Sequence, residues 1–472
     1  MVEKTELEWD KRIPLLLQPQ MEPTSPDIQS HLKKTGNQWT AVAHIITGVI
    51  GAGVLSLAWS VAQLGWIAGP LTMLIFASIT FLSASLLINC YRYPDPDIGP
   101  SRNPSYLESV RVILGKKSAA VCSVFLRLNF LKLGIVYTIT SATSMRAILR
   151  SNCYHFKGHK APCRYDNITV YMVLFGLIQI VLSQIPNFQE MQWLSNIAAA
   201  MSFSYASIGS ALSLGRVIEN GEVKGSIEGA PTNTTIEKIW LIAQALGSIA
   251  FAFPFAIILI EIQGTLRPHP PEKVTMKKAS TIAICTTTFF YLCCGGFGYA
   301  AFGSSAPGNI LTGFGFYEPY WLIDFANVCI ITHLVGAYQV FSQPLYADLE
   351  GCITGKYPNS SMINSNYTLK VPILSVFRLN LLRLILRSAY VCLVTGVAVA
   401  FPYFNQVVGV AGGLNFWPLV IFFPVEMYFV QKKTASWTAK WILLRLYTVV
   451  MLFVSLFSLV GSVQGLIKAR FG

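Results

Sequence analysis

Three glycines interrupt an apolar stretch near the start of the chain, HIITGVIGAGVL at residues 44–55. Gly48, Gly51 and Gly53 each destabilise a helix by about 1 kcal/mol relative to alanine, so they favour a break there. A second apolar stretch, ALGSIAFAFPFAIILIE at residues 245–261, contains Pro254, which removes a backbone donor and also interrupts a helix. At such breaks the positive end of one half-helix favours an anion, and free carbonyls favour a cation. Together the two stretches predict a site for a small zwitterion.

The candidate binding atoms at both breaks belong to the backbone. We expect amides of the first break to bind a carboxylate, and carbonyls of the second to bind an ammonium group. The residues concerned are Gly51, Ala52, Gly53 and Val54 at the first break, and Phe251, Ala252 and Phe253 at the second. An alternative stays open, in which the glycines only let two helices pack closely, with Gly48 and Ala52 as a pair of small residues four positions apart.

Ionisable residues within apolar stretches are costly in a bilayer and are therefore functional candidates. His44 precedes the first break and His333 lies within the apolar stretch 318–349. Histidine has an ordinary pKa of about 6.5, which lies between the pH of an acidic exterior and that of a neutral cytosol, so its protonation differs between the two sides of such a membrane. The alternative for each is a neutral, buried histidine that bonds a carbonyl. Glu261, after the second break, is either an inner gate and proton acceptor or a helix-end carboxylate that faces the cytosol.

Two basic residues, Arg127 and Lys132, lie within the apolar stretch 119–148. Arg127 is near enough to one end of that stretch to extend its guanidinium group to the interface. Lys132 is too deep for that, so we expect it to be paired or deprotonated. Asp324, or an acidic substrate, is the expected partner.

Membrane-spanning helices must position these residues. The chain has 472 residues, of which 53% are hydrophobic and 12% charged, and its mean hydropathy is +0.52. Soluble domains carry roughly twice that charge. A spanning helix needs about 20 apolar residues. Eleven stretches qualify: 40–60, 66–91, 119–148, 168–186, 191–215, 237–261, 276–302, 318–349, 382–401, 404–430 and 440–463.

The predicted helices fall into two sets of five. Helices 1–5 occupy about residues 40–215, helices 6–10 about 237–430, and helix 11 about 440–463. Helices 1 and 6, which carry the breaks, begin the two sets and run in opposite directions. Interrupted helices at matching places in two inverted halves are typical of the binding sites of secondary transporters. The fold class is therefore an all-α polytopic membrane protein, with a transmembrane domain at 39–472.

Basic residues predict the orientation. Residues 1–38 form a polar, disordered tail with no apolar core, so no cleaved signal peptide is expected. With this tail inside, the inner segments hold 22 Lys and Arg residues and the outer segments eight. An inner excess of basic residues predicts a cytoplasmic N-terminus and an outer C-terminus. The net charge of +13 is thus a signal of topology, and no nucleic-acid partner is expected.

The predicted outer loop at 149–167 contains Cys153 and Cys163. Outside the cytosol these cysteines favour a disulfide. The alternative is a metal pair with His155 and His159, although the spacing matches no closed metal site. The loop also ends in a glycosylation sequon at Asn167. Asn233 begins a second outer sequon.

Seven longer motifs resemble the plant amino acid permeases of the amino acid/auxin permease family, within the amino acid–polyamine–organocation superfamily. They are TGNQWTAVAHIITGVIGAGVLSLAWSVAQLGWIAGP (35–70), LSQIPNF (182–188), LIEIQGTL (259–266), GYAAFG (298–303), PGNILTGFGFYEPYWLIDFANVCI (307–330), GAYQVFSQP (336–344) and FPYFNQVVGVAGGLNFWPL (401–419). The resemblance covers everything from about residue 35 to the end. It implies eleven helices in the leucine-transporter type of 5+5 inverted repeat, with helices 1 and 6 discontinuous.

The resemblance also implies proton-coupled symport of amino acids by alternating access. No enzyme activity, metal or cofactor is then expected, with protons as the coupling ion. In the related sodium-coupled fold, helices 1 and 8 hold a sodium ion, so His44, Thr332 and His333 are expected where a proton would replace it. Tyr137 matches the family's YTIT motif and is expected to reach the substrate carboxylate, or else simply to pack. The family usually has neutral residues at the positions of Arg127 and Lys132, which leaves the substrate class open.

A second hypothesis is a sensor that binds an amino acid with little net transport. A membrane enzyme such as an acyltransferase is disfavoured, because His44 and His333 have no acidic cluster near them in sequence. The partners are then an amino acid and the lipid bilayer, with the chain acting as a monomer. The plasma membrane is the expected location. A dileucine-like motif, EWDKRIPLLLQP at 8–19, leaves a vacuolar or endosomal membrane as the alternative.

Overall fold

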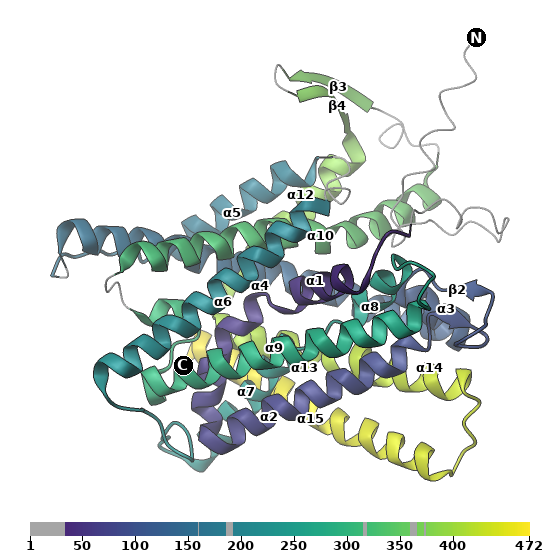
Figure 1. Cartoon of the computed structure of the whole chain (residues 1–472). Helices are drawn as coiled ribbons and strands as arrows, with labels where there is room; N and C mark the ends of the chain where they lie inside the picture. Colours follow the sequence, from purple (N-terminus) through teal and green to yellow (C-terminus); the bar gives the residue numbers. More distant parts are fainter. Residues whose placement is uncertain (1–33, 159, 186–191, 315–318, 359–365, 372–373) are drawn as a thin grey trace.

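The computed structural model describes residues 34–158, 160–185, 192–314, 319–358, 366–371 and 374–472 (Figure 1). The dileucine-like motif lies outside these residues. The elements are α1 (Gln38–Val49), η2 (Ala52–Ser56), α2 (Leu57–Ile88), β1 (Arg92–Tyr93), β2 (Ser101–Arg102), α3 (Tyr106–Leu114), α4 (Lys116–Lys157), α5 (Ile168–Ser183), α6 (Gln192–Asn220), α7 (Thr235–Ala252), α8 (Ala256–Gly264), α9 (Glu272–Phe302), η4 (Gly303–Ser305), η5 (Ile310–Phe314), α10 (Tyr320–Lys356), β3 (Asn366–Val371), β4 (Leu374–Asn380), α12 (Leu381–Ala400), α13 (Phe404–Asn415), η6 (Phe416–Phe422), α14 (Phe423–Gln431) and α15 (Ala439–Phe471).

Nine helical stretches of the described residues are long and apolar enough to cross a membrane, and α5 is apolar but shorter. The separately predicted helices 40–60 and 66–91 differ most from the structure, because residues 52–88 form one helical stretch. Within it Gly65 has φ 86° and ψ 177°, which is not helical. A β-carbon on Gly65 would also lie 2.6 Å from the carbonyl carbon of Ile227. Gly65 therefore makes a sharp corner, and the count of eleven crossings stays a prediction.

The helices pack in two groups (Figure 1). One group contains α4, α5, α10 and α12, and the other contains α2, α7, α9, α13 and α15. Helices α1, α6 and α8 lie between the groups, and α6 packs against both α10 and α9. The two small sheets, β1–β2 and β3–β4, are antiparallel pairs outside the helices.

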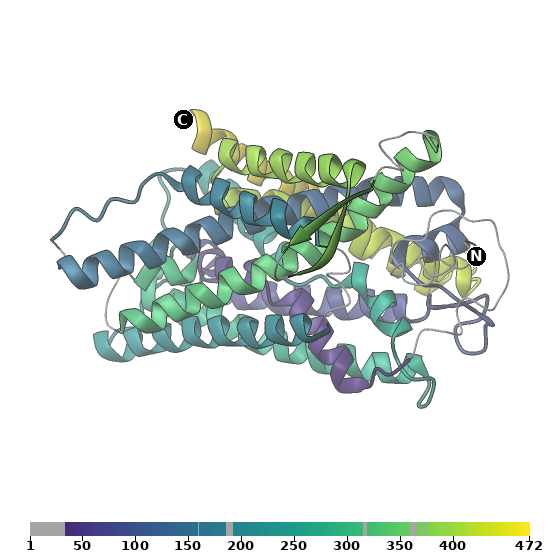
Figure 2. The same ribbon diagram turned by 90° about the horizontal axis from the view of Figure 1, so that it is seen from above.

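The two interrupted segments run antiparallel. The backbone amide of Gly36, just before α1, donates to Thr265 O at 3.0 Å, just after α8, and Arg267 N donates back to Gly36 O at 3.0 Å. The start of α1 and the end of α8 therefore share one end of the bundle, which also holds α3 and which we call the α3 end. Gly472 lies at the opposite end (Figures 1 and 2).

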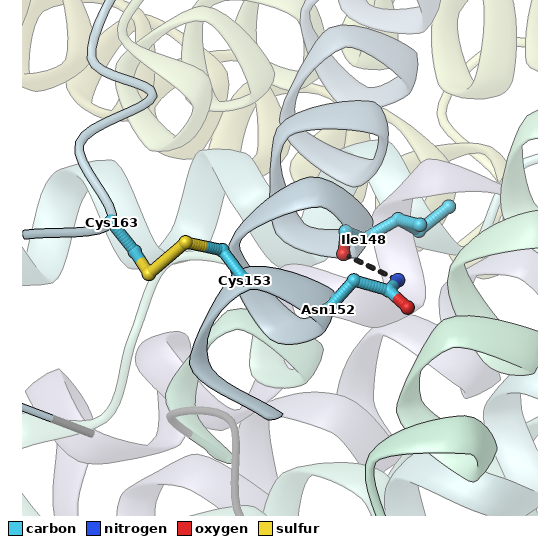
Figure 3. Close-up of a disulfide and its surroundings, with 4 residues drawn as sticks. All are labelled: Ile148, Asn152, Cys153 and Cys163. Atoms are coloured by element: carbon cyan, nitrogen blue, oxygen red, sulfur yellow. Dashed lines mark hydrogen bonds between the residues drawn. A yellow bond between two sulfur atoms is a disulfide. The ribbon is translucent and has the colours of Figure 1, made fainter. Parts of the chain in front are cut away.

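A disulfide joins Cys153, near the end of α4, to Cys163 in the loop before α5 (Figure 3). Both sulfur atoms are used in this bond, so the alternative of a metal pair with His155 is wrong. The ring of His155 stacks on Tyr320 instead, with centroids 3.7 Å apart. His159 lies outside the described residues. The sequon residues Asn167 and Asn233 are both exposed, and their glycosylation stays a prediction.

A charge cluster lies at the α3 end. The carboxylate of Glu272 is 1% exposed, and it lies 2.8 Å from Arg92, 3.2 Å from Arg102 and 3.8 Å from Lys34. These residues come from the segment before α1, from β1 and β2, and from the first turn of α9. One buried carboxylate thus pairs with three cations from separate segments.

We expect Glu272→Gln to lower the free energy of unfolding by about 3 kcal/mol, because it leaves three neighbouring, partly buried cations without their shared counter-charge. The measurement is the thermal unfolding midpoint of the purified protein in detergent. Glu108→Gln is the matched control, since its pair with Arg111 at 3.3 Å is one-third exposed on both sides and is worth at most about 1 kcal/mol. Equal losses from the two variants would contradict the assigned role of Glu272.

Candidate functional site

The first break separates α1 from η2. Ile50 (φ −78°, ψ 85°) and Gly51 (φ −126°, ψ −144°) both leave the helical region. The carbonyl of Ile50 accepts hydrogen bonds from Ser202 Oγ at 2.8 Å and Tyr205 OH at 3.1 Å, both on α6. An open backbone persists at this depth because α6 supplies the missing donors. The first amides of η2, like those of any helix, have no acceptor within their own helix.

The second break separates α7 from α8 around Pro254. The hydroxyl of Tyr291, on α9, lies 2.8 Å from Ala252 O and 2.8 Å from Val49 O. One side chain thus reaches carbonyls at both breaks. A β-carbon on Gly53 would lie 2.8 Å from the α-carbon of Ala252. The two breaks are therefore in direct contact, and glycine at position 53 is what permits this approach.

Close packing and an open backbone occur together here. A β-carbon on Gly48 would lie 2.5 Å from Ile258 Cδ1, so this glycine does let α1 approach α8, as the packing interpretation expects. Packing alone does not account for the non-helical dihedral angles at residues 50 and 51.

A small cavity of about 80 Å³ lies at the junction of the breaks. Five of the predicted binding residues line it: Gly51, Ala52, Gly53, Tyr137 and Phe251. Three do not, namely Val54, Ala252 and Phe253. The ring of Phe253 packs edge-on against Tyr291 at 5.0 Å, and the Ala252 carbonyl already has the Tyr291 hydroxyl as donor. Val54, Ala252 and Phe253 thus lie outside the cavity lining, and their part in substrate binding stays a prediction.

A larger cavity of about 670 Å³ lies at the α3 end. His44 and Glu261 line it, together with Arg127 and Asp348, whose side chains form an ion pair at 2.6 Å. The two cavities share four lining residues, which are Gly48, Ile257, Ile258 and Phe341. These four residues form the partition between the cavities.

Glu261 is neither fully solvated nor ion-paired among the described residues. Its Oε1 accepts the backbone N–H of Tyr106 at 3.1 Å, at the start of α3, and its Oε2 is buried without a hydrogen-bond partner. The side chain therefore joins α8 to α3 along the larger cavity. The carboxylate lies inside the protein, next to a space at the α3 end, and its role as an inner gate and proton acceptor or as a helix-end carboxylate stays a prediction.

His333 is buried, with 1% exposure, and contacts the first break. Its Nδ1 lies 3.1 Å from Ser202 Oγ and 3.1 Å from Ala198 O. Its Nε2 would lie 3.9 Å from a β-carbon on Gly51. Because a carbonyl oxygen only accepts, Nδ1 carries the hydrogen in the neutral ring, and Nε2 presents its lone pair towards Gly51.

The other predicted members of the proton site lie elsewhere. The side chain of Thr332 is exposed, because adjacent residues of a helix point in different directions and His333 takes the inward one. His44 lines the larger cavity, two helical turns before the break. Ser202, on α6, occupies the place expected for Thr332, and nothing in the sequence singled it out.

The predicted pair of Lys132 and Asp324 is wrong. Lys132 Nζ donates to Ala411 O at 2.5 Å and lies 5.7 Å from the ring centre of Phe251. Asp324 instead accepts from Asn152 Nδ2 at 2.6 Å. Asn152 is on the same helix as Lys132 but twenty residues further along, or roughly 30 Å at 1.5 Å per residue. Lys132 and Asp324 therefore lie at different depths.

Sequence reasoning also missed two amides in the small cavity, Asn129 and Asn415. Asn415 Nδ2 donates to Asn129 Oδ1 at 3.4 Å and to Phe125 O at 3.3 Å. One available signal was the spacing, since Asn129 precedes Lys132 by three positions and shares its helix face.

Comparison with known proteins agrees with this architecture. A family model described as transmembrane amino acid transporter protein matches residues 34–468. The chain is 58% identical over 455 residues to probable amino acid permease 7 of Arabidopsis thaliana, covering 95% of this chain and 97% of the relative. It is 50% identical over 437 residues to amino acid permease 3 of the same plant, covering 92% and 91%.

A solved structure shares the fold. The crystal structure of MhsT in complex with L-phenylalanine superposes with a TM-score of 0.52 at 11% identity, covering 89% of this chain and 98% of that one. The expected leucine-transporter type of fold is thereby confirmed. The matched family consists of transporters rather than enzymes. This chain therefore belongs to the transmembrane amino acid transporter family, as one of the plant amino acid permeases.

Proposed function

We propose that this permease is a proton-coupled amino acid symporter that works by alternating access. The observation that carries the proposal is the direct contact of two broken helices at a cavity, with a buried histidine beside the first break. Helix breaks supply both signs of partial charge without any ionised side chain. Such a site suits the α-carboxylate and α-ammonium groups that all amino acids share.

The substrate pose follows from the cavity lining. The α-carboxylate binds the backbone amides at Ala52 and Gly53, at the start of η2, beside Gly51, whose own amide donates to Val49 O at 2.9 Å. The α-ammonium group binds backbone carbonyls beside Phe251, whose ring borders the side-chain space. Tyr137 lines the same cavity, and its hydroxyl donates a hydrogen bond to the carboxylate.

The proton binds His333 at Nε2, the ring nitrogen that faces Gly51. The resulting imidazolium places a positive charge beside the first break, where it favours the substrate carboxylate. Release on the neutral cytosolic side removes that charge and weakens substrate binding. His44 and Glu261, at the larger cavity, then accept the proton on its way out.

Alternating access requires the partition between the cavities to open. The partition residues Gly48, Ile257, Ile258 and Phe341 separate the small cavity from the space at the α3 end. We propose that the α3 end faces the cytosol, as the distribution of Lys and Arg predicts. We take the corner at Gly65 as the boundary between the first two crossings, so the chain crosses the membrane eleven times. Because this number is odd and the N-terminus is in the cytosol, Gly472 lies outside. We also propose that the protein acts in the plasma membrane as a monomer and is glycosylated at Asn167 and Asn233.

Uptake by cells or sealed vesicles that contain the protein tests this function. We expect acidification of the outside, or an inside-negative potential, to raise the accumulation of labelled amino acid. Transport that ignores both would disprove proton coupling while leaving the permease function. Binding without any accumulation would instead favour the sensor hypothesis.

A further inference from the structure

Lys132 is the one charged side chain among the described residues that line the small cavity. Its ammonium group has a backbone carbonyl, Ala411 O, and the ring of Phe251 as neighbours, but no carboxylate of the described residues pairs with it. A cation in a mostly apolar site is costly unless an anion accompanies it. When Lys132 is protonated, the cavity therefore has one unit of positive charge that no described residue balances.

Asn129 adds a second, independent donor. Its side chain is 7% exposed and its Nδ2 has no hydrogen-bond partner among the described residues, although the side chain lines the cavity. Asn129 and Lys132 are three positions apart on α4, so their side chains leave the same face of the helix. A buried amide donor without an acceptor is destabilising, and a ligand oxygen would offset that cost.

An ammonium group and an amide donor on one helix face suit a carboxylate. Resting on the proposed transport function, we propose that Lys132 and Asn129 bind the side-chain carboxylate of an acidic amino acid, which makes this permease selective for aspartate and glutamate. The broken helices bind the α-carboxylate and α-ammonium groups, so the second carboxylate has its own pair of donors on α4. The Ala411 carbonyl holds the ammonium group in place while the site is empty.

Glutamate and glutamine provide the test, because they have nearly the same shape and differ in side-chain charge. We expect the wild-type protein, in vesicles with an acidic outside, to take up glutamate at least tenfold faster than glutamine. Lys132→Gln should reverse that preference while glutamine uptake persists. Lys132→Arg should retain it, since the charge remains. Asn129→Leu should reduce the preference for glutamate over glutamine several-fold.

Lys238→Gln is the matched control. Lys238 Nζ also donates to backbone carbonyls, those of Gln63 at 3.0 Å and Ala230 at 2.8 Å, but it does not line the cavity. This variant should keep the wild-type ratio of glutamate to glutamine uptake. A ratio that Lys132→Gln leaves unchanged would overturn the selectivity proposal, as would a wild type that prefers glutamine or transports only neutral amino acids. In those cases transport itself survives, whereas a wild type that accumulates no amino acid would refute the proposed function instead.

Discussion

Gly53→Leu is expected to abolish amino acid uptake, with a loss of at least a hundredfold. Even the β-carbon of alanine would lie 2.8 Å from the α-carbon and 3.0 Å from the β-carbon of Ala252. A backbone atom cannot rotate away as the tip of a side chain can, so the two breaks must separate. The longer leucine side chain also enters the small cavity, whose volume is about 80 Å³. Both effects act on the substrate site rather than on the rest of the bundle.

Two measurements separate loss of binding from loss of folding. Labelled uptake reports transport, and the rise in thermal unfolding midpoint with added amino acid reports binding. Gly296→Leu is the control, because a β-carbon there meets nothing within 4 Å. We expect this variant, on α9, to transport normally. If Gly53→Leu kept its substrate-induced stabilisation, the small cavity would not be the binding site.

The helix breaks were predictable because their cause is local. Glycine and proline change the backbone itself, and the structure ends α1 at Val49 and α7 at Ala252, within the two stretches that contain these residues. The corner at Gly65 also forms at a glycine. It depends in addition on the close approach of residue 227, and the sequence does not reveal that contact. The predicted helices 40–60 and 66–91 therefore overlap α1, η2 and α2, but the prediction puts the boundary between two helices where the structure has a corner within one helical stretch.

The directions of side chains were harder to predict, because they depend on how the helices rotate against one another. Sequence gives the depth of Thr332 and His333, but one residue changes the direction by about 100°. The same limit applies at the second break, where Phe251 lines the cavity and Phe253 packs on Tyr291. The interaction of Lys132 with Ala411 was not predictable at all, since a backbone carbonyl has no signature in sequence.

His333→Gln is expected to uncouple transport from the proton gradient. Glutamine keeps a donor for Ala198 O, which now accepts from Nδ1 at 3.1 Å, but it cannot take up a proton near neutral pH. Without the charge beside the first break, an acidic exterior no longer favours substrate binding on that side. Amino acid should then enter only until its concentrations inside and outside are equal. Exchange of labelled for unlabelled amino acid needs no net proton movement, so it should persist.

The competing site is His44, at the larger cavity, and His44→Gln is the matched variant. If His333 carries the coupling proton, His44→Gln slows release at the α3 end but keeps accumulation driven by the pH gradient. If His44 carries the coupling proton, His44→Gln should abolish accumulation driven by the pH gradient, and His333→Gln should keep it. Ser202→Ala adds a further test, because Ser202 Oγ contacts both His333 Nδ1 at 3.1 Å and the carbonyl of Ile50 at 2.8 Å. Its loss should weaken the pH dependence of uptake if the charge on His333 is sensed at the first break through this hydroxyl.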